Sequence, residues 1–540
     1  MHPPVDPAAP ALYARRWWAL STLCLSLLIV MTGNTSLNVV IPTLSRKLDA
    51  TNSQLQWAVA IYSLVFAGLL FSTASLGDRF GRKGALQLGL GLFFAGSALA
   101  SQSTSMNQII GCRALMGIGA ALIMPSTLSI LVNIFPPNER QKAIALWASI
   151  SGAGGSLGPI MSGWMLGHFW YGSVFLVNLP LIALAFVSGW FLIPKSKDPD
   201  QGKLDPLGAV LSSVGIASLV YGLIQAPEHG WSSPSTLVWF VVALVTLTLF
   251  TLWEHRCEEP MLDVRYFKNP GFSTGTGGMI LLFLSMFGVM FLLTQYFQLI
   301  IGYSALETAV RFLPMSPVMM IVGMQSPRIT AAIGANKAVA LGMIFNAISM
   351  FMLIGLHTTP NYPYVLTAFI FLAGGLALSM SPMTAAIMIA VPPRRAGAGS
   401  ATNDATREIG AALGVAVLGS VAASQFSSKI GPLVSGLPAS LQGESRSSLS
   451  GALRSAGEIG GPTGETLAEG ARHAFIAGIH EAALVGGVLL ALAAVCIWKF
   501  FPTSVSHSGA EQGHHGGAPG AANPSGTLDD AELTSVLEDR

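Results

Sequence analysis

The chain has 540 residues and a formal net charge of +2, with 52% hydrophobic and 10% charged residues. Soluble domains carry about 25% charged residues, so this composition excludes an ordinary globular enzyme and is typical of a polytopic membrane protein. No phosphate-binding Gly-x-x-x-x-Gly-Lys loop and no His-Glu-x-x-His zinc motif occurs. We therefore expect no enzymatic activity, no cofactor and no metal site. The four cysteines lack metal-ligand spacing, which predicts four free thiols.

Fourteen apolar runs are each long enough to cross a membrane, because a spanning helix needs about 20 residues. The first run follows Arg15-Arg16-Trp17-Trp18 without a small-residue cleavage site, which argues against a signal peptide and predicts residues 1–17 as a cytoplasmic N-terminus. An even number of spans places both termini on one side. The runs cover approximately residues 18–41, 55–76, 85–104, 107–132, 142–166, 172–193, 206–226, 235–254, 273–301, 305–325, 337–357, 361–391, 404–425 and 475–501.

Basic residues concentrate in alternate connections between these runs. The short connections on the opposite side hold essentially only Arg46 and Lys47. Cytoplasmic loops of membrane proteins carry an excess of Lys and Arg. The asymmetry predicts a multi-pass membrane protein with both termini in the cytoplasm.

Two segments are too polar to span a membrane. Residues 426–472 are rich in Ser, Gly, Pro and Glu, with a weak amphipathic pattern. We predict that they form a long extracytoplasmic loop between the thirteenth and fourteenth spans. Residues 503–540 are rich in Gly, Ala and Pro, which predicts a disordered cytoplasmic tail.

The order of the runs indicates an internal duplication. Segment 326–337 joins the tenth and eleventh runs, the same place in the second half that segment 74–83 has in the first. We predict six-helix bundles at residues 18–195 and 273–502, with a linker of two extra transmembrane helices at 196–272. Paired six-helix halves around a midplane cavity are a transporter architecture.

The connection 74–83 has the sequence ASLGDRFGRK, with one acid and three basic residues between two spans. It resembles the loop signature of the major facilitator superfamily, Gly-x-Leu-a-Asp-Arg-x-Gly-Arg-Lys, with alanine in place of the first glycine. The resemblance implies a major facilitator fold and a loop that latches the two halves together in an outward-open state. The latch residues are then Asp78, Arg79, Gly81, Arg82 and Lys83.

The fourth run contains Arg113 within RALMG, which resembles the Arg-x-x-x-Gly signature of the same superfamily. An arginine inside an apolar run is costly and must face protein or water. The resemblance implies a role in proton transfer. The alternative is an interfacial arginine that extends outward to the membrane surface.

The fifth run contains SGAGGSLGPIMSG, which resembles the antiporter signature ending Gly-Pro-x-x-Gly-Gly. Gly154 and Gly158 fall on one helix face, Pro159 is expected to bend the helix, and Gly163 closes the motif. Small residues let a second helix pack closely. The resemblance implies export, whereas the alternative is plain helix packing.

The first run ends TGNTSLNVVIP, which is similar to the first-helix signature of the fourteen-helix drug:proton antiporter family. Thr35, Asn38 and Pro42 match that signature. Gly33 stands where the family has an aspartate, the usual charge for a cationic substrate or a proton. Further matches follow in order at residues 56–62, 175–180, 204–208, 302–307, 311–314, 407–410 and 414–416.

Few ionisable residues are available to couple protons to transport. Glu307 and Arg311 are spaced to pair with each other. Asp404 and Glu408 open the thirteenth run, where they could instead be a charge cluster at the cytoplasmic end. The proton-coupling candidates are Arg113, Glu307, Arg311, Asp404, Glu408, His480 and Glu481.

Aromatic, methionine and amide side chains are candidates for lining a substrate cavity. Such surfaces re-pack around varied ligands, although the same residues on a lipid-facing helix would have no such role. The candidates are Asn34, Asn38, Trp57, Tyr62, Phe283, Phe287, Phe291, Gln295, Met315 and Met319.

The leading functional hypothesis is an inner-membrane multidrug or hydrophobic-compound exporter, working by proton-coupled antiport with alternating access. The second is a specialised exporter of an endogenous lipid, siderophore or peptide, and the third is a membrane sensor or scaffold that does not transport. The expected partners are a lipophilic small-molecule substrate, protons and membrane lipids. We expect a monomer and no nucleic-acid partner.

Overall fold

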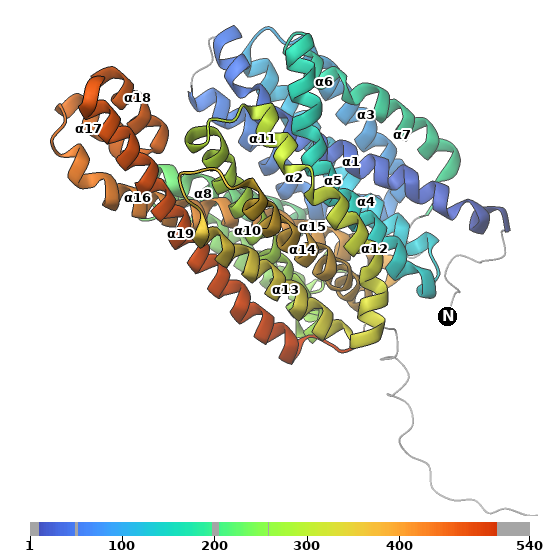
Figure 1. Ribbon diagram of the computed structural model, residues 1–540. Helices are drawn as coiled ribbons and strands as arrows, with labels where there is room; N and C mark the ends of the chain where they lie inside the picture. Colours follow the sequence, from blue (N-terminus) through green and yellow to red (C-terminus); the bar gives the residue numbers. More distant parts are fainter. Residues whose placement is uncertain (1–9, 49–51, 197–204, 258, 505–540) are drawn as a thin grey trace, which may run out of the picture. The chain divides into compact units, whose positions relative to one another are not determined.

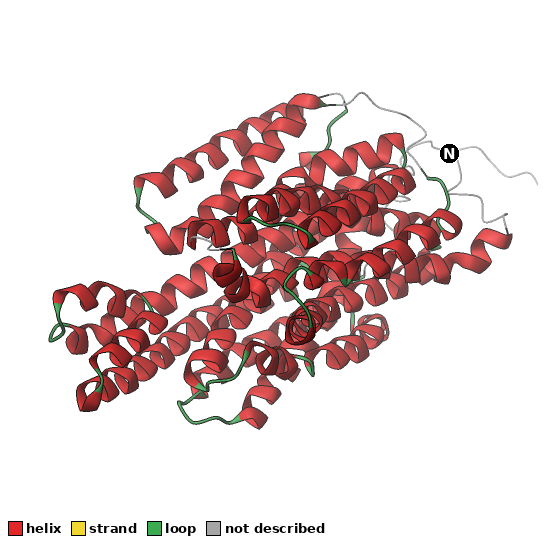
Figure 2. Cartoon of the chain, turned by 90° about the horizontal axis from the view of Figure 1, so that it is seen from above, coloured by secondary structure: helices red, strands yellow, loops and turns green. Residues whose placement is uncertain are grey.

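The computed structural model describes residues 10–48, 52–196, 205–257 and 259–504. Within these ranges all regular secondary structure is helical (Figure 2). Thirteen of the described helical segments are long and apolar enough to cross a membrane. The chain is thus a multi-pass membrane protein, and the predicted all-α polytopic fold is confirmed.

Thirteen of the fourteen predicted spans coincide with these thirteen segments. The fourteenth, predicted at 142–166, lies within α5, a helix of 32 residues that is rich in glycine and serine. Of the predicted tail, residues 505–540 lie outside the described residues, as do residues 1–9 of the predicted N-terminus.

The first group of helices corresponds to the first six predicted runs (Figure 1). Helix α4 packs against α2 and α3, while α1 packs against α5 and α7. The sixth run is split in two by a break at Val177. These helices are α1 (Pro10–Lys47), α2 (Asn52–Phe80), α3 (Arg82–Ser101), α4 (Met106–Ile134), α5 (Pro137–His168), α6 (Ser173–Leu176) and α7 (Asn178–Leu192).

Two helices are inserted after the first group. Helices α8 (Pro206–His229) and α9 (Pro234–Arg256) pack against each other, and α8 also packs against α2. Both helices begin with proline at the first position, where its missing N–H costs nothing. A short 3₁₀ helix, η1 (Val264–Lys268), leads from this pair into the second group.

The second group holds the remaining helices. Helix α13 packs against α14 and α19, and α10 packs against α14 and α15. Two segments, η2 and η5, have π-helical hydrogen bonding. The elements are α10 (Pro270–Gln295), η2 (Tyr296–Ile300), α11 (Ala305–Phe312), α12 (Met315–Ile333), α13 (Ala335–Met352), η3 (Leu353–Gly355), α14 (Tyr362–Ala390), η4 (Pro393–Arg395), α15 (Ala396–Leu413), η5 (Gly414–Leu418), α16 (Gly419–Val434), α17 (Ala439–Ser447), α18 (Leu449–Ile459) and α19 (Gly461–Phe500).

The prediction of a long loop at 426–472 is wrong, because this segment is helical. It comprises the end of α16, all of α17 and α18, and the first three turns of α19. The Ser448 side chain accepts a hydrogen bond from the Gly451 N–H and caps α18. Apolar residues bury one face of each helix against the next, in an apolar layer that is continuous with the main core. Its buried members include Phe426, Ile430, Val434, Leu449, Ala452, Leu467 and Ala471.

The two groups contact each other along α15 and α5. Helix α15 packs against α2 and α4, while α5 packs against α11, α12 and α14. Close approach is possible because glycine lines the contact: a Cβ atom at Gly163 of α5 would lie 3.0 Å from Leu306 Cδ1 of α11. This interface positions the candidate site.

Candidate functional site

Asp78 joins the turn between α2 and α3 to the start of α15. Its Oδ1 accepts a 2.6 Å hydrogen bond from Arg82 Nε, and its Oδ2 accepts a 2.9 Å bond from the Gly397 N–H. Arg82 Nη2 donates to the Pro393 carbonyl oxygen at 3.2 Å. Gly81 makes the turn possible, since its φ of 119° is disfavoured for residues with a Cβ. Two of the predicted latch residues, Asp78 and Arg82, therefore contact the second group of helices, and Gly81 shapes the turn that places them.

The other two predicted latch residues have different contacts. Lys83 Nζ donates to the Trp190 carbonyl oxygen at 2.6 Å and lies 5.9 Å from the Trp190 ring centroid, within the first group. The Arg79 guanidinium lies 5.5 Å from the ring centroid of its neighbour Phe80. Lys83 thus ties α3 to α7 within its own group.

Arg113 is completely buried in α4. Its Nη1 donates to the Gly33 carbonyl oxygen of α1 at 2.8 Å, and its Nε donates to the Ala58 carbonyl oxygen of α2 at 3.1 Å. The guanidinium lies 4.3 Å from the centroid of the Tyr62 ring, a cation–π distance. Nη2 has no hydrogen-bond partner in the described part of the chain. Arg113 therefore faces the protein interior, and the alternative of an arginine extending to the membrane surface does not fit.

Gly33 lies beside Arg113 without supplying a charge. A Cβ atom there would lie 2.5 Å from Phe93 Cζ and 3.6 Å from the Met116 methyl carbon. Phe93 of α3 thus fills the space that a side chain at this position would need. The arginine that resembles the family signature is held by backbone oxygens and an aromatic face.

Helix α15 carries a second group of buried charges. Arg407 Nη1 lies 3.6 Å from Asp404 Oδ1, and the guanidinium lies between the rings of Phe283 (4.9 Å) and Trp147 (5.7 Å). Asp404 and Arg407 are buried, whereas Glu408 is half-buried. Asp404 Oδ2 has no hydrogen-bond partner among the described residues. This is a charge cluster inside the helix bundle.

Tyr62 lies beside Arg113 on a helix that packs against α15. It is completely buried in α2, and its O–H donates to the Val30 carbonyl oxygen at 3.2 Å. Its ring faces the Arg113 guanidinium, and α2 packs against α15, which carries the second group of charges. The site thus spans the interface between the two groups of helices, with α4 and α2 on one side and α15 on the other.

The glycine stripe of α5 faces α1 and α11. A Cβ atom at Gly154 would lie 2.8 Å from Met31 Cβ, and one at Gly158 would lie 2.9 Å from the Thr32 carbonyl oxygen. Pro159 lies inside the helix, and Gly163 contacts Leu306. The segment Gly154–Gly158 also reads Gly-x-Ser-x-Gly, but it lies inside a helix and lacks the strand–turn–helix context of a hydrolase nucleophile.

The remaining coupling candidates lie away from this site. Glu307 is exposed and forms a capping box with Ser304 at the start of α11. Arg311 does not form the predicted ion pair with it; its guanidinium lies 4.9 Å and 4.5 Å from the ring centroids of Tyr303 and Tyr362.

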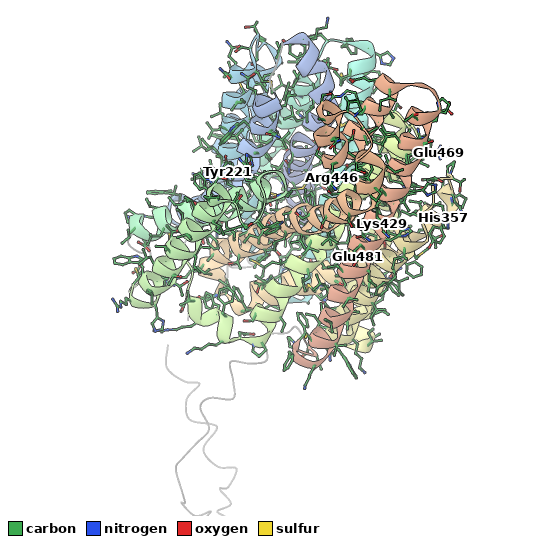
Figure 3. The ribbon with its side chains drawn as sticks, turned by 90° about the vertical axis from the view of Figure 1, so that its left-hand side faces the viewer. Tyr221, His357, Lys429, Arg446, Glu469 and Glu481 are labelled. Carbon is green, nitrogen blue, oxygen red and sulfur yellow. The ribbon has the colours of Figure 1, made fainter. Side chains whose placement is uncertain are left out.

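His480 and Glu481 lie in α19, well inside the helix because it begins at Gly461. His480 Nε2 forms a 3.0 Å hydrogen bond with the Leu356 carbonyl oxygen, so one ring nitrogen already has a partner. Glu481 is exposed on the same helix (Figure 3). Neither residue contacts the charges of α4 or α15 in the described structure.

The predicted cavity residues fall into different environments. Phe283 is buried at Arg407 and stacks on Phe287, with ring centroids 6.2 Å apart. Trp57 is exposed and stacks on Tyr221 of α8 at 5.5 Å, and Phe291 is also exposed. The Asn38 side chain lies outside the described residues. Met315 and Met319 are buried, whereas Asn34 and Gln295 are half-buried.

Two residues of the site were missed by sequence reasoning. Trp147 stacks on Arg407 and donates from Nε1 to Thr127 Oγ1 at 3.2 Å. Phe93 fills the space at Gly33. Both are aromatic residues in apolar runs, and no local pattern distinguishes them from core residues.

Comparison with known proteins identifies the family. The model of the Major Facilitator Superfamily matches residues 23–415. The chain is 33% identical to the multidrug efflux pump LfrA of Mycolicibacterium smegmatis, over 90% of this chain and 96% of the relative. It is 30% identical to the tetracenomycin C resistance and export protein of Streptomyces glaucescens, over 91% of this chain and 93% of the relative. The solved structure of the human organic anion transporter MFSD10 shares the fold, with a TM-score of 0.61 at 13% identity, covering 89% of this chain and 99% of that one. The chain therefore belongs to the major facilitator superfamily.

Proposed function

We propose that this protein exports lipophilic small molecules, including drugs, across the inner membrane. The observation that carries the proposal is similarity along nearly the whole length to an efflux pump and to an export protein. The small-residue stripe of α5, which resembles the antiporter signature, supports the same direction of transport.

The transport mechanism that we propose is alternating access by the two groups of helices. Rocking of two halves about a midplane site is the common mode of such folds. The Asp78–Gly397 hydrogen bond is the contact that must break and re-form during the cycle. We place this contact and both termini on the cytoplasmic face, because the basic connections lie there, and we propose that the chain works as a monomer.

Resistance of an efflux-deficient host tests the function. Expression of the protein should raise tolerance to several lipophilic compounds, and Asp78→Ala or Arg113→Ala should abolish the gain. Unchanged tolerance to every compound in the panel would refute drug export. Full tolerance in both variants would refute the roles given to these residues.

Proton coupling is assigned to Glu408. The acid usually present in the first helix of the family is Gly33 here, so a carboxylate must come from another element. Glu408 is half-buried on α15, which packs against α2 and α4, the helices that carry Tyr62 and Arg113. A carboxylate in the membrane interior is a functional candidate by default.

Transport into proteoliposomes tests this assignment. Wild-type protein should concentrate a lipophilic dye when a pH gradient is imposed. Glu408→Gln should lower gradient-driven transport about tenfold or more, while exchange of labelled for unlabelled dye continues. Glu469→Gln, an exposed acid of α19 (Figure 3), is the matched control and should behave as wild type. Full gradient-driven transport by Glu408→Gln would exclude the assignment.

A second candidate function is export of an endogenous lipid, siderophore or peptide. The helices at 436–460, which extend beyond the membrane-spanning part of α16 and α19, favour it. Deleting this segment should spare drug tolerance and abolish handling of the endogenous compound. If no compound moves in proteoliposomes at any pH gradient, the chain is a sensor or scaffold and neither export proposal holds.

A further inference from the structure

The inserted helices carry a buried acidic pair that export has not explained. Asp205 caps the start of α8 and is 7% exposed, while Glu254 lies near the end of α9 and is 2% exposed. Burying one carboxylate without a cation is costly, and burying two side by side is more so. No Lys or Arg of the described residues forms an ion pair with either one.

Every oxygen of Asp205 is satisfied. Its Oδ1 accepts hydrogen bonds from the Gly208 N–H at 2.9 Å and from Trp253 Nε1 at 2.9 Å. Its Oδ2 lies 3.0 Å from the same Trp253 Nε1. The indole and the cap fix the orientation of this carboxyl group.

Glu254 has one satisfied and one unsatisfied oxygen. Its Oε2 accepts a 3.2 Å hydrogen bond from the Leu262 N–H, in the segment that leads to η1. Its Oε1 is buried and receives no N–H or O–H from the described residues. A buried acceptor without a donor is rare in native structures and calls for an explanation.

The position of Gly208 shows where this unsatisfied oxygen points. A Cβ atom at Gly208 would meet Asp205 Oδ2 first and would lie 2.8 Å from Glu254 Oε1. Both oxygens therefore border the same small space beside Gly208. Two ionised carboxylates cannot hydrogen-bond, because each is only an acceptor.

We propose that Glu254 carries a proton on Oε1 and donates it to Asp205 Oδ2, forming a joint that holds α8, α9 and the 261–262 segment together. The proton supplies the donor that Glu254 Oε1 lacks and removes one of the two buried negative charges. Among the described residues, the Leu262 N–H donates to Glu254, and Asp205 is the acid that lies beside its unsatisfied oxygen.

The joint senses pH at the face that we place in the cytoplasm. While the proton is bound, the Glu254–Leu262 hydrogen bond fixes the approach to α10. When rising pH removes the proton, the two carboxylates carry like charges in a site without water, and the contact between them opens. The stabilising effect is therefore present at low pH and is lost as pH rises. The proposal does not depend on which compound, if any, the protein exports.

Infrared spectroscopy of the purified full-length protein tests the shared proton. The wild-type spectrum should contain a protonated-carboxyl band that is absent from Glu254→Gln and from Asp205→Asn. Glu469→Gln, an exposed acid, should leave that band unchanged. If the Glu254→Gln spectrum differs from wild type no more than that of Glu469→Gln, the proposal fails.

Hydrogen exchange tests the joint. The rate of backbone amide hydrogen exchange at residues 259–264, corrected for its intrinsic pH dependence, should rise about tenfold between low and high pH in the wild type. Glu254→Gln and Asp205→Asn should be nearly independent of pH, since an amide N–H replaces the shared proton at every pH. Glu254→Ala, which removes the contact, should exchange fast throughout. A wild-type profile parallel to that of Glu254→Gln would overturn the proposal.

Discussion

At the scale of single residues, Arg113 shows how a membrane protein holds a buried cation without a buried acid. Two backbone oxygens and the face of Tyr62 surround the guanidinium. Both oxygens belong to helix interiors, where a carbonyl can accept a second hydrogen bond. The sequence predicted a buried arginine, but not these partners, because a backbone acceptor leaves no trace in the amino-acid pattern.

Arg113→Lys should destabilise the protein although it keeps the charge. A lysine cannot reach the Gly33 and Ala58 carbonyl oxygens in the fork geometry of arginine. We expect a loss of about 1–3 kcal/mol in the free energy of unfolding, the cost of an unsatisfied buried polar group. Chemical unfolding in detergent measures it. Arg454→Lys, at an exposed arginine of α18, is the control and should change stability little.

Gly33→Asp alone should destabilise the protein, and a second substitution, Phe93→Ala, should restore part of the lost stability. The new side chain would collide with Phe93, and overpacking of this kind costs about 1–3 kcal/mol. Adding Phe93→Ala opens room for a carboxylate next to Arg113. The double variant should recover stability relative to Gly33→Asp, as judged by its melting temperature. Equal stability of the two variants would show that Phe93 does not occupy this space.

At the scale of elements, the latch depends on how closely α15 approaches the end of α2. A Cβ atom at Gly397 would lie 2.5 Å from Asp78 Oδ2 and 2.9 Å from the Ala74 carbonyl oxygen. Gly397→Ala should therefore push the two groups apart and reduce export as strongly as Asp78→Ala. Gly374→Ala is the control and should leave export unchanged, because a Cβ atom added there would meet no atom of another element within 4 Å. Normal export by Gly397→Ala would remove the latch from the mechanism.

The helices at 426–472 show where sequence reasoning failed at this scale. Their high content of Ser and Gly hid an apolar face, and long apolar runs elsewhere made them look like a loop. Leu449→Asp should unfold α17 and α18 without unfolding the spans, because the main contacts of these two short helices are with each other and with α16 and α19. Protease digestion should then cut within 436–460 in the variant and spare the wild type, with both chains keeping equal dye transport.

Most of the spans were predictable, since hydrophobic length decides them. The breaks within spans were not. Pro180 lies near the division between α6 and α7, yet Pro125 and Pro382 lie inside unbroken helices. The two π-helical segments, η2 and η5, also carry no composition signal. These irregularities depend on packing against other helices, which a single run does not record.

At the scale of the whole molecule, the two groups of helices contact each other along α5 and α15. A Cβ atom at Gly163 would lie 3.5 Å from Leu306 Cβ, within the range for a disulfide. The double variant Gly163→Cys/Leu306→Cys, in a background with Cys257 and Cys496 replaced by serine, should form a disulfide that joins the two groups. Transport should stop on oxidation and return on reduction. Continued transport by the oxidised protein would exclude alternating access through this contact.

The buried charges of the molecule are also distributed between its two groups. Arg113 lies in the first group, and Asp404, Arg407 and Glu408 lie in the second. The sequence supplied these residues as candidates, whereas their placement on the two sides of one interface required the fold, because α2 and α15 are more than 300 residues apart. The site is a property of the packed pair of bundles and of neither bundle alone.

The two partners of the Asp78–Gly397 hydrogen bond should respond differently to mutation, because one is a side chain and the other is a backbone group. The acceptor is a side chain, but the donor is the peptide N–H of Gly397, which every amino acid except proline would supply. Apart from proline at position 397, loss-of-function alleles can therefore delete the contact only from the α2 side. On the α15 side they can act only by adding bulk. Random mutagenesis should return many different substitutions at Asp78, and substitutions at Gly397 whose effect grows with side-chain size.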